Sequence, residues 1–291
     1  MKKLFFLLFL AAFFLSLPAA AQNAAPNSPA NGMALAPARF ELEMQPGTEM
    51  TVVVNLDYRA QENSGKPARI VATLNDWTIT KDGRVQYYPA NSQPGSASSW
   101  LIYSPGEATV VPGVMHQIRV TISVPMNATP GDHLTALIIE QRPETLKSLE
   151  NQRQMIVRYR LASVFYIKVP KLTRRGSVED LYAELTPNGI VVTPTLKNEG
   201  NSVIRPLASV KVLDTEGKVV ADLPEIEPLP ILAGSEMNQA VLIEKALAPG
   251  TYTVKYHIDF QDGGKPTEGV TDLVIKGVSQ IASSKQTPQK P

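Results

Sequence analysis

Alternation of apolar and polar residues dominates the sequence and restricts the chain to β-structure. Segments rich in Val, Ile, Thr, Tyr and Phe repeat with a period of two and are bounded by Pro, Gly, Asn and Asp, which is typical of strands with one buried face. In the first half they are ARFELEM from Ala38, MTVVVNLDY from Met50, ARIVATLNDWTI from Ala68, HQIRVTISV from His116, HLTALIIEQ from His133 and MIVRYRLASVFYIKV from Met155. In the second half they are GIVVTPTLKN from Gly189, ASVKVLD from Ala208, QAVLIEK from Gln239, TYTVKYHIDF from Thr251 and TDLVIKG from Thr271. Only residues 143–154, PETLKSLENQRQ, have a helical composition, with a long loop as the alternative.

A short phrase in which a turn precedes a strand recurs along the chain. It occurs as QPGTEMTVVV from Gln45, VVPGVMHQIRV from Val110, TPGDHLTALI from Thr129, LAGSEMNQAV from Leu232 and APGTYTVKYHI from Ala248. Pro presets φ for the first turn position and Gly supplies a positive φ for the next. Two such turns lie close together late in each half, with 18 residues from Gly113 to Gly131 and 16 from Gly234 to Gly250. The spacing predicts two tandem immunoglobulin-like β-sandwich domains.

The first residues have the features of a secretory signal peptide. Lys2 and Lys3 precede an apolar run from Leu4 to Leu17, and Ala19-Ala20-Ala21 provides small residues at a cleavage site. We expect cleavage after Ala21 and a periplasmic protein of about 270 residues without stable membrane insertion, because no later segment reaches the roughly 20 apolar residues of a membrane span.

The composition of the remaining chain suggests its further division. Residues 22–33 are small, polar and interrupted by Pro, which predicts a flexible leader. The expected order is a signal peptide at 1–21, the leader at 22–33, a first sandwich at 34–170, a linker at 171–177, a second sandwich at 178–277 and a disordered tail at 278–291.

Few residues are available for chemistry. The chain has no Cys and three histidines, His116, His133 and His257, so the usual nucleophiles and metal ligands are nearly absent. Each histidine lies within or at the start of an alternating segment, where a strand position explains it. We expect no catalysis, no cofactor and no metal. Without Lys2 and Lys3, 26 basic and 27 acidic residues remain, a balance that argues against nucleic-acid binding.

Two further groups of charged residues have plain structural explanations. Glu41 and Glu43 alternate with apolar residues, so their carboxylates share one face of a strand. A general acid and base could share a face in this way, but a solvated sheet surface gives the same pattern more often. The segment TRRG at 173–176 suits an anion, although an interdomain linker needs no ligand.

The segment from Met155 to Val169 is long for a strand, with 15 residues against a usual five or six. Its odd positions are almost all apolar, and several even positions are basic. One interpretation is a final strand with its apolar face in its own core. The other is an edge strand that lends apolar residues to a partner by β-augmentation.

Several segments together resemble the first domain of periplasmic pilus-assembly chaperones, the PapD-like group. In chain order they are PARFELEMQPGTEMTVVVNL, NDWTITKDGRVQYYP, SSWLIYSPGEATVVPGVMHQIRVTISVP, GDHLTALIIEQRP and SVFYIKVP, within about residues 34–170. The second half, with LKNEGNSVIRPLASVKVLDTEGKVV and LAPGTYTVKYHIDF, resembles generic bacterial immunoglobulin-like modules.

The resemblance implies a chaperone that binds exported, pilin-like subunits by donor-strand complementation, with an outer-membrane usher as a further partner. It implies client contacts by Val157, Tyr159, Leu161 and Phe165 of the long strand. It also implies that Arg39, in the family's first-strand Arg position, anchors the carboxylate of a client. The family's partner Lys falls near Ser163, so that anchor is missing. Arg160 or Lys168 is the alternative anchor, although both lie on the face of the strand opposite Ser163. The alternative function is a non-catalytic envelope interaction or scaffold protein with the same fold and no pilin client.

Overall fold

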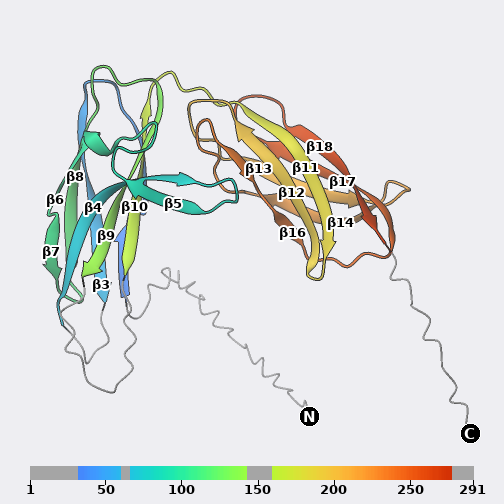
Figure 1. Cartoon of the computed structure of the whole chain (residues 1–291), viewed down its shortest axis with the longest axis horizontal. Coiled ribbons are helices and arrows are strands. Elements are labelled where there is room, and N and C mark those ends of the chain that lie inside the picture. Colours follow the sequence, from blue (N-terminus) through green and yellow to red (C-terminus); the bar gives the residue numbers. More distant parts are fainter. Residues whose placement is uncertain (1–31, 60–65, 143–158, 277–291) are drawn as a thin grey trace, which may run out of the picture.

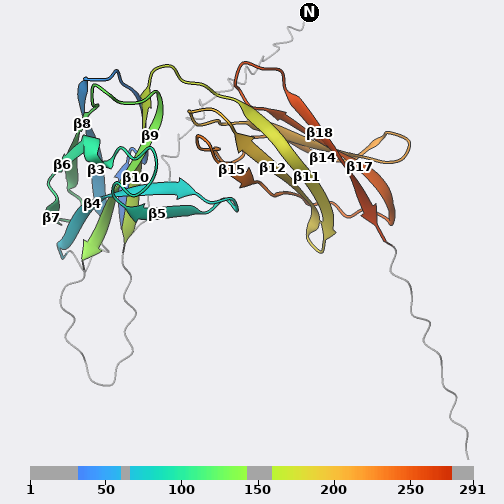
Figure 2. The same cartoon turned by 45° about the horizontal axis from the view of Figure 1, so that its top comes forward.

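The strands form two β-sandwiches that follow one another along the chain (Figures 1 and 2). The structure is a computed structural model that describes residues 32–59, 66–142 and 159–276. Apart from one 3₁₀ turn, η1 (Ser98–Trp100), its regular elements within these ranges are strands. The expected all-β fold with two tandem immunoglobulin-like sandwiches is confirmed, while the segment 143–154, with its helical composition, lies outside the described residues.

The first sandwich consists of two sheets. One has the order β1-β3-β8-β6, and the other has the order β2-β10-β9-β4-β5 with β7 paired to β4. The strands are β1 (Gly32–Ala36), β2 (Arg39–Glu43), β3 (Glu49–Arg59), β4 (Ala68–Ile79), β5 (Val85–Pro89), β6 (Leu101–Ser104), β7 (Glu107–Val110), β8 (Met115–Ser123), β9 (Gly131–Arg142) and β10 (Arg160–Val169).

The second sandwich begins at β11. One of its sheets has the order β11-β12-β15 with β16 also paired to β12, and the other has the order β14-β13-β17-β18. The strands are β11 (Gly176–Thr186), β12 (Gly189–Asn198), β13 (Leu207–Leu213), β14 (Val219–Ile226), β15 (Glu236–Asn238), β16 (Val241–Ile243), β17 (Gly250–Asp259) and β18 (Thr267–Ile275).

Period-two alternation builds a core in each sandwich. Along β8, Ile118, Val120 and Ile122 are buried, and the residues between them are half-buried or exposed. Glycines supply the positive φ of two hairpin turns, with φ of 82° at Gly83 between β4 and β5 and 81° at Gly217 between β13 and β14.

The chain changes sheets between β1 and β2. β1 pairs antiparallel with β3, and β2 pairs parallel with β10 on the other sheet. Pro37 lies between the two strands and has no N–H to continue a ladder, so the pairing breaks there. The stack of Phe40 on Phe165, with ring centroids 4.7 Å apart, holds β2 in its new position.

Two of the expected boundaries shift. β1 starts at Gly32, inside the expected leader 22–33, because Met33 is buried in the first core. β11 starts at Gly176, inside the expected linker 171–177, where the glycine packs directly against Phe260. The expected signal peptide and the expected tail at 278–291 lie outside the described residues, and the other boundaries stay predictions.

The predicted edge strand from Met155 to Val169 is corrected over much of its length. The strand that forms is β10, from Arg160, and residues 155–158 lie outside the described ranges. β10 pairs with β9 over its whole length and with β2 from Val164 to Lys168. From Val164 to Lys168, β10 is therefore an inner strand, because β2 belongs to the same sheet and lies beside it.

The β4–β5 hairpin reaches toward the second sandwich (Figure 1), and the two sandwiches share an apolar cluster. Its buried members are Trp77, Ile79, Ala136, Ile138 and Tyr166 from the first sandwich and Val203, Leu232 and Met237 from the second. At the hairpin, Lys81 forms an ion pair with Glu236, and its carbonyl accepts a 2.7 Å hydrogen bond from the N–H of Asn238. In the ranges described, no helix has the length and apolar character required to cross a bilayer.

Candidate binding site at the junction of the sandwiches

The start of β10 has an open backbone edge. The N–H of Val164 donates to the carbonyl of Ala38 over 2.9 Å, so the backbone groups of even-numbered residues in β10 face β2. Those of Arg160 and Ala162 face the same way, but the pairing with β2 begins only at Val164. Among the described residues, these two positions have no strand partner on that side, which leaves them available to a further strand.

The side chains around this edge divide between two environments. Tyr159 and Leu161 are half-buried against the core of the first sandwich, and the ring of Tyr159 lies over Gly32. Ala162 and Val164 point to the other face and pack in the cluster shared with the second sandwich. The edge therefore lies at the rim of the junction.

The residues expected to contact a client are not equivalent. Phe165 has an exposed fraction of 0% and belongs to the first core, so it does not face a partner in this conformation. Tyr159 and Leu161 retain exposed surface, and Val157 lies outside the described residues. Phe165 lies between β2 and β9 and pairs with both, whereas Tyr159 and Leu161 precede the pairing with β2.

A cluster of basic side chains surrounds Glu41 on the face of β2 that points to the second sandwich. Lys168 Nζ lies 2.7 Å from Glu41 Oε2, and Arg205 Nη2 lies 2.8 Å from Oε1. Arg39 Nε is 3.2 Å from the same Oε1. Glu41, Arg39 and Lys168 belong to the first sandwich and Arg205 to the second, so one carboxylate links both.

The members of this cluster differ in solvent exposure. The side chain of Arg39 is 53% exposed, whereas that of Lys168 is 10% exposed. Burial raises the pKa of Glu41, but the hydrogen bonds and charges of Lys168 and Arg205 outweigh it and lower the pKa below its usual value. Glu41 is thus held as a carboxylate among cations.

A small cleft of about 240 Å³ opens beside this cluster. Its lining residues are Glu41, Lys168, Arg174, Val203, Arg205, Phe260 and Gln261. Arg174 makes no ion pair within the described ranges. With Arg39 beside it, the cleft has four cations against the carboxylates of Glu41 and the nearby Asp132, an excess of positive charge that suits an anion.

The structure alters the expected arrangement of anchors. Ser163 is buried on the core side, where its hydroxyl donates to the carbonyl of Pro37 over 2.8 Å. Arg39 is opposite Val164 in the pairing of β2 with β10, on the face that also carries Lys168. Lys168 is on the face opposite Ser163, as expected, and this is also the face of Arg39. Arg160 lies elsewhere, over the ring of Tyr87 at 5.8 Å.

Arg205 is a member of the cluster that sequence reasoning missed. It lies between β12 and β13, in the segment NSVIRP, with no motif around it. Its guanidinium lies over the ring of Tyr166 at 5.6 Å, a contact that depends on how the two sandwiches pack. No local pattern in the sequence carries that information.

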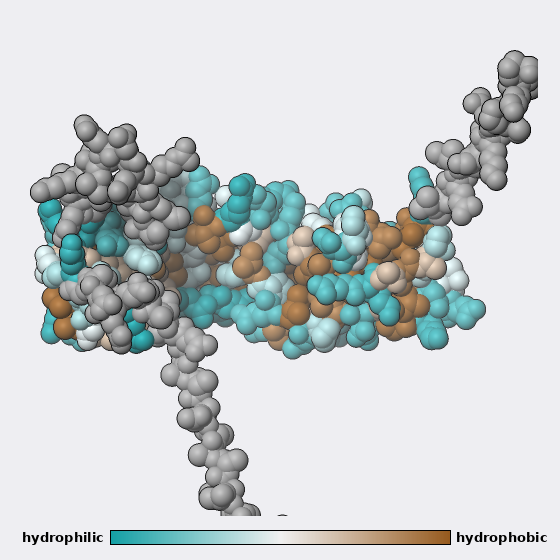
Figure 3. Space-filling view, turned by 90° about the horizontal axis from the view of Figure 1, so that it is seen from below, coloured by the Kyte–Doolittle hydropathy of each residue, from teal (hydrophilic) through white to brown (hydrophobic). Residues whose placement is uncertain are grey.

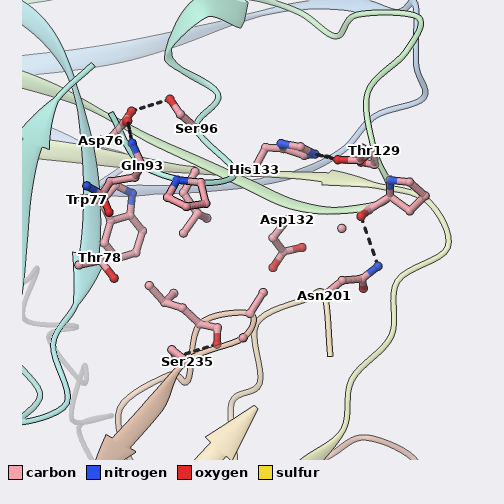
Figure 4. Close-up of a pocket in the computed structure, with 18 residues that line it drawn as sticks. Asp76, Trp77, Thr78, Gln93, Ser96, Thr129, Asp132, His133, Asn201 and Ser235 are labelled. Atoms are coloured by element: carbon pink, nitrogen blue, oxygen red, sulfur yellow. Dashed lines mark hydrogen bonds between the residues drawn. The ribbon is translucent and has the colours of Figure 1, made fainter. Parts of the chain in front are cut away.

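A second and larger cavity of about 460 Å³ lies between the loops of the two sandwiches (Figure 4). At its rim, Asp132 accepts hydrogen bonds from the N–H of Val203 over 2.7 Å and from the hydroxyl of Ser202 over 3.0 Å. Asn201 donates to the carbonyl of Pro130 over 3.3 Å, as the dashed line in Figure 4 marks. Burial raises the pKa of Asp132 above its usual value, and the two hydrogen bonds lower it by less than burial raises it. The polar groups at this rim therefore bind the sandwiches to each other.

On the other side of the cavity, Asp76 organises the loop that precedes η1. It accepts from the N–H groups of Ser92 and Gln93 over 2.7 and 2.9 Å, and from the hydroxyls of Ser96 and Ser98 over 2.6 Å each. Burial raises the pKa of Asp76, but these four hydrogen bonds together lower it below its usual value. The carboxylate is thus a structural acceptor.

The histidines have structural positions. His116 lies in β8 and its Nε2 accepts from the N–H of Val111 over 2.9 Å, while the ring of His133 lies 4.3 Å from that of Trp100. Within the described ranges, no group of three or more potential ligands could hold a metal ion. Of the other candidates, Glu43 is exposed on the face of Glu41, and the segment 173–176 lends Arg174 to the cleft.

Exposed apolar side chains also occur away from the junction. Figure 3 shows apolar groups among polar ones on one face of the second sandwich. Tyr182, Val270 and Val274 are among the exposed apolar residues of this sandwich. Nothing in the structure indicates what covers them.

Comparisons with known proteins give similarity of structure alone. No family model and no curated protein matches the chain. Among solved structures, it is similar to one described as a chaperone–tip adhesin complex in CFA/I fimbriae biogenesis, with 10% identity, 84% of this chain and 99% of that chain covered, and a TM-score of 0.43. It is similar to the Salmonella enterica SafA pilin–SafB chaperone complex, with 12% identity, coverage of 84% and 98%, and a TM-score of 0.42. It is also similar to the CsuC–CsuE complex of Acinetobacter baumannii, with 15% identity, coverage of 83% and 98%, and a TM-score of 0.41. At these values nothing about the function of this chain follows from the likeness.

Proposed function

We propose that this chain is a periplasmic chaperone of the pilus-assembly type, which binds exported subunits by strand addition and acts without catalysis. The observation that carries the proposal is the open edge of β10 at Arg160 and Ala162. The basic cleft lies toward the other end of the same strand, at Lys168. An added strand gains its affinity from backbone hydrogen bonds and its specificity from alternate side chains.

The side chains near the edge fit this role. Tyr159 and Leu161 are apolar, half-buried and close to the place where an added strand would lie. A client strand paired with β10 would cover their remaining exposed surface. Val157 and Phe165 belong to the same alternating set. Phe165 lies in the core, whereas Val157 lies outside the described residues and stays a prediction, so the client contact is argued from Tyr159 and Leu161.

The cleft supplies the second half of the proposal. Arg39 and Lys168 lie on one face of the sheet with Arg205 opposite them, and all three cations meet at Glu41. We propose that Arg39, whose side chain is the most exposed of the three, holds the carboxylate of a client. The family resemblance in the sequence places an Arg at this position.

The test is recovery of exported proteins with the full-length chain from the periplasm of its source. We expect Arg39→Ala to melt near wild type and to lose most of the recovered client, because a charge-assisted hydrogen bond contributes on the order of 1.5–3 kcal/mol. Arg84→Ala is the matched control, since Arg84 is a well-exposed Arg paired with Asp82 on the β4–β5 hairpin. Unchanged recovery with Arg39→Ala removes this residue from the mechanism.

A scaffold or envelope interaction protein is the second candidate function. It is favoured by Ser163 in place of a basic anchor and by the engagement of Lys168 and Arg205 with Glu41. Such a protein would bind its partner independently of the β10 edge. Retention of a partner by variants that block this edge would support it.

A further inference from the structure

The basic cleft already contains an anion that belongs to the chain. Glu41 has both carboxylate oxygens engaged, Oε2 by Lys168 and Oε1 by Arg205 and Arg39. This is how a free carboxylate would be bound in the same place, with separate donors on its two oxygens. We propose that Glu41 is the resident counter-ion of the cleft and that it sets the affinity of the cleft for an incoming carboxylate.

The inference rests on the proposed function, because it concerns the same cleft and the same class of ligand. An external carboxylate gains Lys168 and Arg205 only if Glu41 releases them. If both carboxylates stay, two like charges lie close together in a partly buried site, which disfavours the bound state. Glu41 therefore lowers the affinity of the cleft for any anion.

Glu41 also has a role when the cleft is empty. The side chain of Lys168 is only 10% exposed, and a buried ammonium without a partner is costly. Glu41 neutralises it and, through Arg205, connects the two sandwiches. The remaining field comes from Arg39, which is more than half exposed, and from Arg174 on the cleft wall. Arg39 contacts Glu41 through Nε alone, and Arg174 makes no ion pair within the described ranges, so both keep donors for an incoming anion.

The chain offers a matched control in Glu43. It lies on the same strand and the same face as Glu41, opposite Lys168 in the pairing of β2 with β10. It is exposed and makes no ion pair within the described ranges. Glu43→Gln therefore removes the same charge from the same surface without emptying the cluster.

The test uses the full-length mature chain and two small probes, N-acetyl-leucine, which has a free carboxylate, and N-acetyl-leucinamide, which does not. Binding is followed by NMR titration for wild type, Glu41→Gln and Glu43→Gln. We expect Glu41→Gln to bind N-acetyl-leucine at least about tenfold more tightly than wild type, equivalent to roughly 1.4 kcal/mol. The affinity for N-acetyl-leucinamide should not change, and Glu43→Gln should match wild type.

Three results would overturn the proposal. They are equal or weaker binding of N-acetyl-leucine by Glu41→Gln, the same gain in Glu43→Gln, and an equal gain for the amide. If Glu41→Gln is too unstable to titrate, the carboxyl carbon signal of Glu41 in the wild-type chain replaces it. That signal should shift as N-acetyl-leucine saturates the cleft, and a signal that stays constant contradicts the proposal.

These outcomes are separate from those of the proposed function. In one outcome, Glu41→Gln gains affinity for the carboxylate but the chain recovers no exported client. This result supports the counter-ion role of Glu41 and contradicts the chaperone function. In the other outcome, the chain recovers a client through the β10 edge but Glu41→Gln gains no affinity for the carboxylate. This result supports the chaperone function and contradicts the counter-ion role of Glu41.

Discussion

Asp132 of the first sandwich accepts a 2.7 Å hydrogen bond from the backbone N–H of Val203 in the second. The same carboxylate accepts from Ser202 over 3.0 Å. Together with the apolar cluster around Trp77 and the pairing of Arg205 with Glu41, this contact makes the junction an extensive interface. The basic cleft, which residues of both sandwiches line, depends on this interface.

Replacing Asp132 should weaken the coupling between the sandwiches. Asp132→Ala leaves the Val203 N–H without its acceptor, which costs about 1–3 kcal/mol, and calorimetry should show the melting transition broadening or splitting. Asp132→Asn keeps an acceptor and serves as the control.

The raised pKa of Asp132 gives this control a further expectation. A carboxyl with a raised folded-state pKa binds its proton more tightly in the folded chain, so its contribution to stability declines as the pH rises from 3.8 through the folded value. Asp132→Asn should lack this decline and be at least as stable as wild type at neutral pH. A neutral-pH melt of Asp132→Ala equal to that of Asp132→Asn would show that the hydrogen bonds do not couple the sandwiches.

Asp76 should have the opposite pH dependence. Its folded-state pKa is lowered, so its contribution to stability is present above 3.8 and is lost as the pH falls through the folded value. Asp76→Asn should cost about 2–3 kcal/mol at neutral pH because it weakens charge-assisted hydrogen bonds. Denaturant unfolding across pH checks this, and the difference from wild type should narrow only below pH 3.8. A constant difference at all pH values would assign the loss to packing.

Alanine substitutions of Phe165 and Leu161 should differ in their effect on stability, because one residue belongs to the core and the other to the proposed binding surface. Phe165→Ala should lower the free energy of unfolding by about 3–5 kcal/mol, since its ring is fully buried against Phe40. Leu161→Ala should cost less, about 2 kcal/mol, because Leu161 is only half-buried. Urea titrations of the full-length variants measure both. Equal costs would place Leu161 in the core and remove it from the client surface.

Export should remove the first 21 residues. The basic start, the apolar run and Ala19-Ala20-Ala21 motivate cleavage after Ala21. Intact-mass measurement of the periplasmic protein should give a chain that begins at Gln22. Recovery of a chain that still begins at Met1 contradicts both the cleavage and the expected localisation.

The sequence predicts the strands better than it predicts their neighbours. Alternation is a local property, so β8 and β9 could be located from their residues. The pairing of β2 with β10 depends on a crossing between sheets at Pro37, and alternation is the same in an inner strand and in an edge strand. Alternation alone therefore groups Phe165 with a client surface, whereas in the structure it belongs to the core.

The candidate site divides in the same way. Arg39 was found because it lies in a segment with a family resemblance. Arg205 was missed because its position over Tyr166 and beside Glu41 requires the second sandwich to pack against the first. The face shared by Arg39 and Lys168 follows from the register of two strands, which the sequence does not specify.

The most direct test of strand addition is Ala162→Pro. The backbone N–H of Ala162 faces away from β9, so proline removes a donor at the open edge and leaves the ladder with β9 intact. Ala162→Gly keeps the donor and is the control for the loss of the methyl group. The measurement is the amount of exported client recovered with each full-length variant from the source periplasm. We predict that wild type and Ala162→Gly recover the client and that Ala162→Pro, folded by circular dichroism, does not. Equal recovery by Ala162→Pro and Ala162→Gly would contradict strand addition at β10.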